Sequence, residues 1–197
     1  METQNLATTI SHVTKFDART GEFLTDSPVI YGMLGRCRIT SIETRQMGSQ
    51  SIKFYKLEIQ KPTLSRSTRQ DPAIWVPVAT AKEKGLRAIM DRAQAEEALK
   101  ILLSREYYFE VGQPWKVVQA QLEKAIQSEG GAGLAKVASF LHVLGKRQIV
   151  PTSEVAKFSE AVNRILYREL SELLDEPMKS IEERVAKGMK HKLIPDS

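Results

Sequence analysis

The hydrophobic pattern changes its period near residue 90, and this change most constrains what the chain can fold into. In residues 36–42 and 52–59, apolar side chains alternate with polar ones, which is typical of half-buried β-strands. From about residue 92 onward, apolar side chains recur every three or four positions, which is typical of amphipathic helices. The sequence therefore predicts an α+β chain of two domains: a β domain over residues 26–90 and an all-α helical bundle over residues 91–187.

The β pattern consists of several short strands at close spacing, and this favours a small barrel of the Tudor or SH3 kind. Residues 46–49 are typical of a hairpin tip. A short strand is predicted at 74–78, and its Pro77 indicates an edge position or a strand end, because proline cannot donate a hydrogen bond to a neighbouring strand. Residues 1–25 show no clear periodicity and are predicted to be a flexible leader, and residues 188–197 a loose tail.

The helical half contains two sequence signals that interrupt or end helices. The glycine-rich stretch at 130–133 is predicted to break the helical pattern, and Pro177 is predicted to stop one helix or start the next. Helices are expected at 93–104, 115–127, 134–144, from about 152, and near 178–187.

Trp115 is the most informative single residue, because it begins a predicted helix. It follows Pro114, which suits a first helical turn where no backbone N–H is needed. An indole exposed there, beside Lys116, could serve as an apolar wedge or stacking surface for nucleic acid. Burial in the core of the helical bundle is the alternative, since most tryptophan side chains are largely buried.

The positive charge of the chain lies in its first half. Residues 1–90 hold 13 lysines and arginines against 8 acidic residues, whereas residues 91–197 hold 16 of each. Such a bias suits an acidic partner or a phosphate backbone. A solvated strand face is the alternative.

Several function classes find no support in the sequence. No apolar run is long enough to span a membrane, and the N-terminus lacks the apolar stretch of a secretory signal. Cys37 is the only cysteine and is expected to be a small buried residue in a strand, so no disulfide or metal site is predicted and a cytoplasmic location is expected. No nucleotide-binding loop, nucleophile elbow or metalloprotease motif occurs, and His142 is expected to be structural or exposed. We therefore expect no enzyme, no cofactor and no small-molecule substrate.

The residues of both domains, taken in order, resemble the CarD/CdnL family of bacterial RNA polymerase-binding transcription factors. The resemblance extends over about residues 27–187. It is carried by the segments 29–31, 35–39, 41–45, 54–57, 75–78, 85–87, 115–124, 134–138 and 166–170.

The resemblance implies that the β domain is Tudor-like and docks on the β subunit of RNA polymerase. The docking positions of the family match Arg45, Met47 and Trp75. Trp75 departs from the basic residue that some members carry, so an apolar or rearranged contact is expected there. A solvated hairpin position is the alternative for Arg45.

The resemblance also implies that the helical domain meets promoter DNA at the upstream edge of the melted bubble. The family tryptophan that wedges into the minor groove there, and so stabilises the open complex, matches Trp115. Phosphate contacts are expected from the nearby cations Lys116, Lys124, Lys146 and Arg147.

Some positions depart from the family pattern. Val117 and Ala120 stand where other members can carry basic residues, so we expect weak, sequence-independent DNA contacts that matter once polymerase has delivered the domain. Two alternatives remain open. One is a protein-interaction adaptor whose β domain binds another partner and whose helical domain is a scaffold. The other is a regulator that binds DNA tightly without polymerase, which the neutral second half disfavours.

Overall fold

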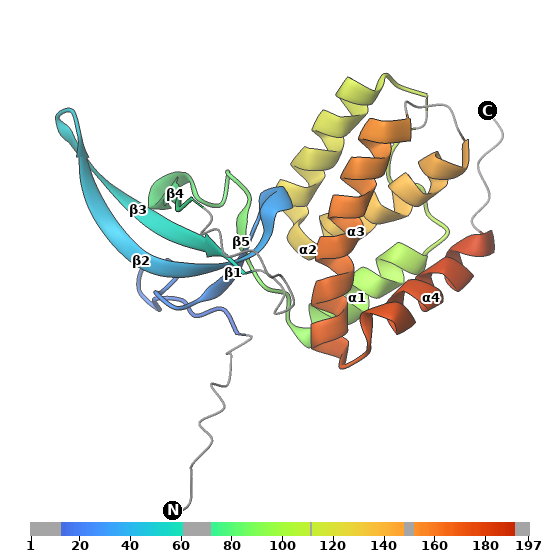
Figure 1. Cartoon of the computed structure of the whole chain (residues 1–197), viewed down its shortest axis with the longest axis horizontal. Coiled ribbons are helices and arrows are strands. Elements are labelled where there is room, and N and C mark those ends of the chain that lie inside the picture. The colour runs from blue at the N-terminus through green and yellow to red at the C-terminus, as the bar shows by residue number, and fades with distance from the viewer. Residues whose placement is uncertain (1–12, 61–71, 111, 148–151, 192–197) are drawn as a thin grey trace, which may run out of the picture.

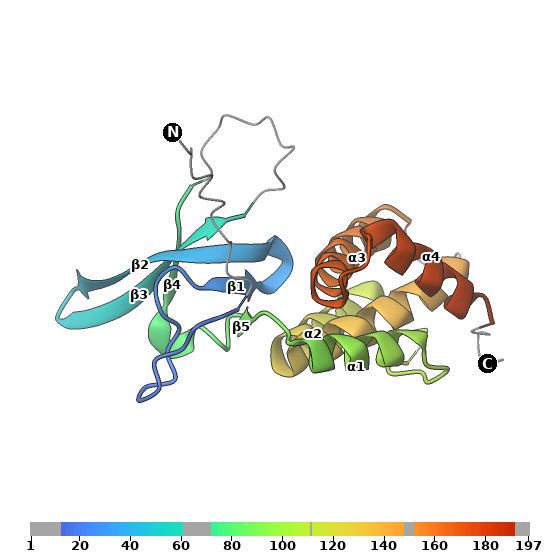
Figure 2. The ribbon, with the colours of Figure 1, turned by 90° about the horizontal axis from the view of Figure 1, so that it is seen from below.

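The protein consists of a β-sheet half followed by a helical half, as Figures 1 and 2 show. The structure is a computed structural model and describes residues 13–60, 72–110, 112–147 and 152–191, with the backbone alone at 145–147, 152 and 191. Within these residues, five antiparallel strands precede four α-helices, which confirms the α+β class predicted from the sequence.

The five strands form one sheet in the order β4-β3-β2-β1-β5. Their bounds are β1 (Pro28–Tyr31), β2 (Gly35–Met47), β3 (Gln50–Ile59), β4 (Ile74–Pro77) and β5 (Leu86–Ala88). In this order β4 and β5 stand at opposite edges and do not pair with each other. The described strands therefore form an open sheet, and the closed barrel predicted from the sequence is not confirmed. Pro77 ends β4, which confirms the predicted edge strand.

Two short 3-10 turns join parts of the sheet. The turn η1 (Gly32–Leu34) lies between β1 and β2, and η2 (Val78–Thr80) follows β4. β2 and β3 form a long hairpin whose tip contains Gly48 at φ 65°, a conformation that favours glycine.

The core of the sheet lies on one of its faces. Tyr55 and Leu57 of β3 are buried there, and their cross-strand partners include Ile39 of β2 and Val76 of β4, which are also buried. Cys37 of β2 joins them with no exposed surface, which confirms the prediction for this residue.

Residues 13–26 correct the prediction of a flexible leader up to residue 25. Phe23 is 3% exposed, and its backbone N–H donates to the Tyr55 hydroxyl at 2.9 Å. The buried Thr14 hydroxyl donates to the Pro28 carbonyl at 2.7 Å and accepts from the Ile89 N–H at 3.0 Å. The segment is therefore folded: it contains one isolated antiparallel bridge, between Phe16 and Phe23, and these hydrogen bonds hold it to the sheet.

The helices of the second half are α1 (Arg92–Leu103), α2 (Trp115–Arg147), α3 (Thr152–Leu174) and α4 (Met178–Gly188). Asp91 caps α1, because its carboxylate accepts from the Gln94 N–H at 2.7 Å and the Gln94 side chain accepts from the Asp91 N–H at 2.9 Å. Gly130 interrupts α2 with φ 60° and ψ −123°, so the predicted glycine break divides α2 into two halves.

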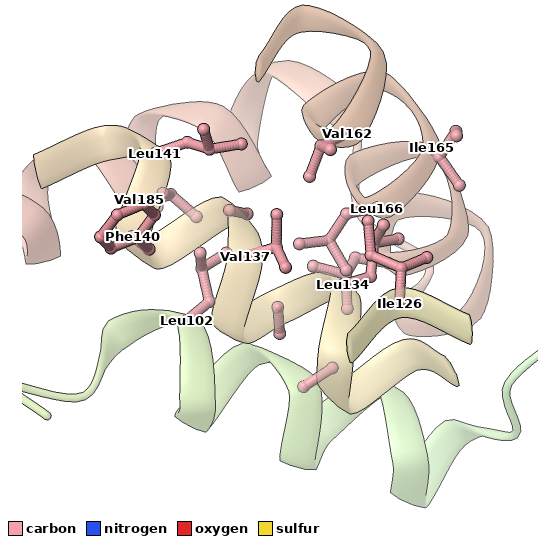
Figure 3. Close-up of a cluster of buried hydrophobic side chains, with 14 of the residues drawn as sticks. Leu102, Ile126, Leu134, Val137, Phe140, Leu141, Val162, Ile165, Leu166 and Val185 are labelled. Carbon is pink, nitrogen blue, oxygen red and sulfur yellow. The ribbon is translucent and has the colours of Figure 1, made fainter. Parts of the chain in front are cut away.

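All four helices contribute to one apolar core, part of which Figure 3 shows. Leu102 of α1, Leu134 of the second half of α2 and Leu166 of α3 are fully buried near its centre, and Val185 of α4 lies at its edge. The chain continues into η3 (Met189–His191), where Met189 is 0% exposed. The loose tail was predicted to begin at residue 188, and this is wrong because Met189 belongs to the core.

Within the described ranges, no helix is both long enough and apolar enough to cross a bilayer.

Candidate protein and nucleic-acid interfaces

One face of the sheet, opposite its core, gathers the three residues predicted to bind a protein partner. Side chains alternate between the faces of a strand, and directly paired residues of neighbouring strands share a face. Arg45 pairs with Ile52, and Lys56 pairs with Trp75. We call this the outer face. It consists of Glu43, Arg45 and Met47 of β2, Ile52, Phe54 and Lys56 of β3, and Trp75 and Pro77 of β4.

Arg45 and Trp75 are in direct contact on the outer face. The guanidinium carbon of Arg45 lies 3.4 Å from the centre of the Trp75 ring, and the Lys56 ammonium lies 5.6 Å from it. A cation over an indole is an attractive arrangement that also restrains both side chains. Arg45 also lies 3.4 Å from the Glu43 carboxylate. Trp75, for which an apolar or rearranged contact was expected, therefore lies beneath a cation from β2, which is separated from β4 by β3.

Much of the outer face remains open to solvent. Met47 is 58% exposed and the Arg45 side chain 45% exposed, while Phe54 and Trp75 are half-buried. An apolar centre with cations beside it is a common composition for a protein-binding surface, in which aromatic residues, methionine and arginine are enriched.

Five of the eight members of this face were not among the predicted binding residues, and three of these five belong to β3. Ile52, Phe54 and Lys56 lie on β3 between the strands that carry Arg45 and Trp75. Their alternate spacing in the predicted strand already placed them on one side of it. Only the register with β2 and β4 shows that this side is the one that carries Arg45 and Trp75.

Trp115 begins α2 as predicted, and its indole is half-buried. The N–H groups of Val117 and Val118 donate to the Pro114 carbonyl at 2.9 and 3.1 Å, which makes Pro114 the start of the first turn. The Trp115 ring meets the edge of Phe158 of α3, with ring centres 5.7 Å apart and planes at 78°. This geometry combines the two alternatives drawn from the sequence, because part of the indole packs on the bundle and part reaches solvent.

The structure describes the side chains of two of the four cations predicted to contact phosphates. Lys116 and Lys124 are exposed on the first half of α2. The side chains of Lys146 and Arg147 fall outside the described residues. Val117, beside Trp115, is 48% exposed and adds apolar surface at the start of the helix.

The two halves of the protein meet at a buried charge. Glu169 of α3 is 3% exposed and accepts hydrogen bonds from both terminal nitrogens of Arg87, at 3.0 and 2.5 Å. The same carboxylate accepts from the backbone N–H of Met90 at 3.0 Å. A bidentate arginine pair inside a protein has strict geometry, so it fixes how α3 sits against β5.

A second set of charges lies beside Glu169. Glu172, one turn further along α3, forms ion pairs with Arg36 of β2 and Arg168 of α3. Arg168 also donates to the Gln60 carbonyl at 3.3 Å. Burial lowers the pKa of the Arg36 and Arg168 guanidiniums from their usual high value. Arg36 is one of the 13 basic residues that give the first half of the sequence its positive charge, but it is buried at this junction and does not add to the charge of the surface.

Apolar contacts complete the junction. Ile30 of β1 belongs to the helical core, and Met33 of η1 packs against it. Gly35 approaches α3 so closely that a Cβ atom there would stand 3.3 Å from Ile165.

No catalytic centre was predicted, and the described residues contain no group of three or more histidine, cysteine or acidic side chains placed to hold a metal ion.

Comparison with known proteins adds no family to this description. No family model and no curated protein sequence matches this chain. Each interface is therefore inferred from the geometry of its residues and from the family resemblance of the sequence.

Proposed function

We propose that this protein is a bacterial transcription regulator that docks on the β subunit of RNA polymerase and stabilises the promoter open complex. Docking is through the outer face of a Tudor-like sheet, and the helical half is thereby brought to promoter DNA. The observation that carries the proposal is the contact between Arg45 and Trp75 beside Met47, because it joins on one exposed surface three positions that the family resemblance singles out. We propose neither an enzymatic reaction nor a cofactor, and we place the protein in the cytoplasm.

The outer face suits an acidic partner segment with apolar side chains. Arg45 and Lys56 supply cations that can form charge-assisted hydrogen bonds, and Trp75 lies beneath both. Met47 and Phe54 supply apolar area toward the hairpin tip.

The DNA step in this proposal belongs to Trp115. Its ring packs against Phe158 in an edge-to-face arrangement, while part of the residue is open to solvent. A supported indole can enter a distorted base step at the upstream edge of the bubble and replace part of the lost stacking. Duplex binding by the helical half alone is expected to be weak, and docking on polymerase compensates by raising the local concentration of the domain.

The packing of Trp115 on Phe158 also favours a second candidate function. If the indole serves only the bundle, the protein is an adaptor whose outer face binds a partner other than polymerase and whose helices act as a scaffold.

The docking step is tested by capture of the isolated N-terminal portion of the polymerase β subunit. Wild-type protein is expected to capture it, and Arg45→Glu to lose most of the captured material, because the substitution reverses the charge over Trp75. Arg19→Glu is the matched control. It makes the same charge change in the exposed turn of the N-terminal segment, which packs beside Tyr55. Absence of capture by folded wild-type protein would contradict docking and favour the adaptor.

The DNA step is tested by the lifetime of open complexes formed with polymerase and the full chain. Trp115→Ala is expected to shorten the lifetime toward that of polymerase alone. Met178→Ala, which removes an exposed apolar side chain from α4, is the control and should leave the lifetime unchanged. An unchanged lifetime with folded Trp115→Ala would restrict the tryptophan to a packing role.

A further inference from the structure

The turn between β4 and β5 lies against the end of the first half of α2. Gly85, at φ +83°, closes this turn, and its N–H donates to the Lys82 carbonyl at 2.9 Å. A Cβ atom on Gly85 would stand 3.6 Å from the Cγ atom of Gln127. The exposed side chains of the turn, Lys82 and Lys84, therefore project from the sheet half at a point where it touches α2.

The solvent side of α2 leads to this turn. Lys116, Ala120, Lys124 and Gln127 follow one another at intervals of four, four and three residues, so they lie along one face of the helix. All four are exposed, whereas Leu122 on the opposite side is fully buried. At about 1.5 Å per residue the row is roughly 16 Å long, and Figure 1 shows the first half of α2 running from the far end of the bundle toward the sheet.

The charges along this row are mainly positive. We call Lys116, Lys124, Lys82 and Lys84 the lysine row, and within the described part of the chain none of them forms a salt bridge. Glu83 is the acidic residue of the turn itself. Of the two acidic side chains on this part of α2, Glu129 pairs with Lys136 at 2.5 Å, whereas Glu123 accepts from the Gln119 amide at 2.9 Å and keeps its negative charge beside the row.

We infer that the lysine row is one continuous surface for the phosphate backbone of duplex DNA, to which the sheet half contributes Lys82 and Lys84. This inference deepens the proposed function and rests on it. The sheet half then has two roles, because its outer face binds protein while its β4–β5 turn extends the DNA contact begun by α2.

Duplex DNA fits the row better than an acidic protein segment does. Beyond Val117 at its start, the described helix between Lys116 and the turn presents Ala120 and polar side chains to solvent, without further large apolar anchors of the kind that a protein interface needs near its centre. Lysines act as hydrated point charges that contact phosphates whatever the base sequence.

The test is the salt dependence of binding between the full chain and a fluorescein-labelled 20-base-pair duplex, followed by anisotropy at low salt. Each phosphate contact contributes about 0.9 to the slope of log affinity against log salt concentration. Lys82→Gln/Lys84→Gln is therefore expected to reduce the slope by about 2, and Lys116→Gln/Lys124→Gln by the same amount. Lys187→Gln/Lys190→Gln, at the exposed end of α4 and in η3, is the matched control and should leave the slope unchanged.

A second measurement uses the wild-type chain. Acetylation of lysines followed by mass spectrometry should show protection by duplex at the lysine row, with Lys187 and Lys190 modified as in the free protein.

Three results would overturn the inference. An unchanged slope for the Lys82→Gln/Lys84→Gln variant, with both lysines still modified in the presence of duplex, would confine the contact to α2. Wild-type binding to polyglutamate as tight as to duplex would indicate an acidic protein partner. Absence of duplex binding at low salt would show that the lysine row does not bind DNA. If the same protein still captures the polymerase β subunit, the docking proposal is unaffected by that result.

Discussion

At the scale of single residues, the two tryptophans show that neighbours in space determine how much of a side chain is exposed. Trp75 lies on an edge strand, where its ring is covered by Arg45 from two strands away. Trp115 lies at a helix start, where its ring packs against Phe158 of α3 in an edge-to-face arrangement. Neither neighbour is close in sequence, so residue type and local pattern could predict where each tryptophan stands but not how much of its ring is free.

The thiol of Cys37 provides a prediction at this scale. Burial raises its pKa to about 11 from an ordinary value of 9.0. Between about pH 9 and 11 the thiol is therefore deprotonated in the unfolded chain but still protonated in the folded protein. The contribution of Cys37 to the free energy of unfolding consequently declines as pH rises through that interval. We expect Cys37 to resist alkylation by iodoacetamide at pH 8 in the folded protein and to react in denaturant. Rapid alkylation under native conditions would contradict the burial.

At the scale of elements, α2 shows what a glycine cluster does inside a helical pattern. Gly130 adopts a positive φ that kinks the helix, and the start of the second half lies close against the end of the first. Gly133 makes this packing possible, because a Cβ atom there would stand 2.1 Å from the Ala125 carbonyl oxygen. The spacing of apolar residues alone cannot report such a close approach between two backbones.

We therefore expect Gly133→Ala to lower the free energy of unfolding by at least about 2 kcal/mol, within the range typical of overpacked sites. Urea denaturation followed by circular dichroism measures this change. Gly188→Ala is the control: a Cβ atom there meets the end of the flexible Leu103 side chain at 2.6 Å, which can move aside. Equal stability of the two variants would contradict the packing at Gly133.

At the scale of the whole molecule, the two halves are joined through α3. Its buried face contributes Ile165 and Leu166 to the helical core, and its next turn carries Glu169 and Glu172 to the sheet. This junction connects the outer face and the lysine row, and under the proposed function it would allow a docked sheet to present the proposed DNA surface in a set direction.

Glu169→Gln is expected to destabilise the protein by about 3 kcal/mol, because removal of one partner from a buried ion pair leaves the other charge uncompensated. The partial exposure of Arg87, whose side chain is 17% exposed, keeps the effect at the low end of the usual range. Chemical denaturation of the full chain measures it. Glu183→Gln is the control, because it removes an exposed ion pair between Lys179 and Glu183. It should change the free energy of unfolding by less than about 1 kcal/mol. An equally small effect of Glu169→Gln would show that the junction does not depend on this charge.

Much of the fold was predictable because it depends on short-range patterns. The change of period near residue 90, the edge position of Pro77 and the start of α2 at Trp115 each follow from a few neighbouring residues. The folded segment at 13–26 and the buried Met189 were missed, because each is held by contacts with distant parts of the chain.

The sequence by itself determined the order of strands and helices and the glycine break in α2, since backbone propensity and alternation are local properties. Tertiary structure alone decided that the sheet stays open, that Arg45 covers Trp75, and that Arg36 and Arg87 face α3 rather than solvent. The physical reason is that register and burial are set by the free energy of packing distant segments together, and a side chain of given chemistry becomes a core residue, a junction or an exposed site according to what is packed against it.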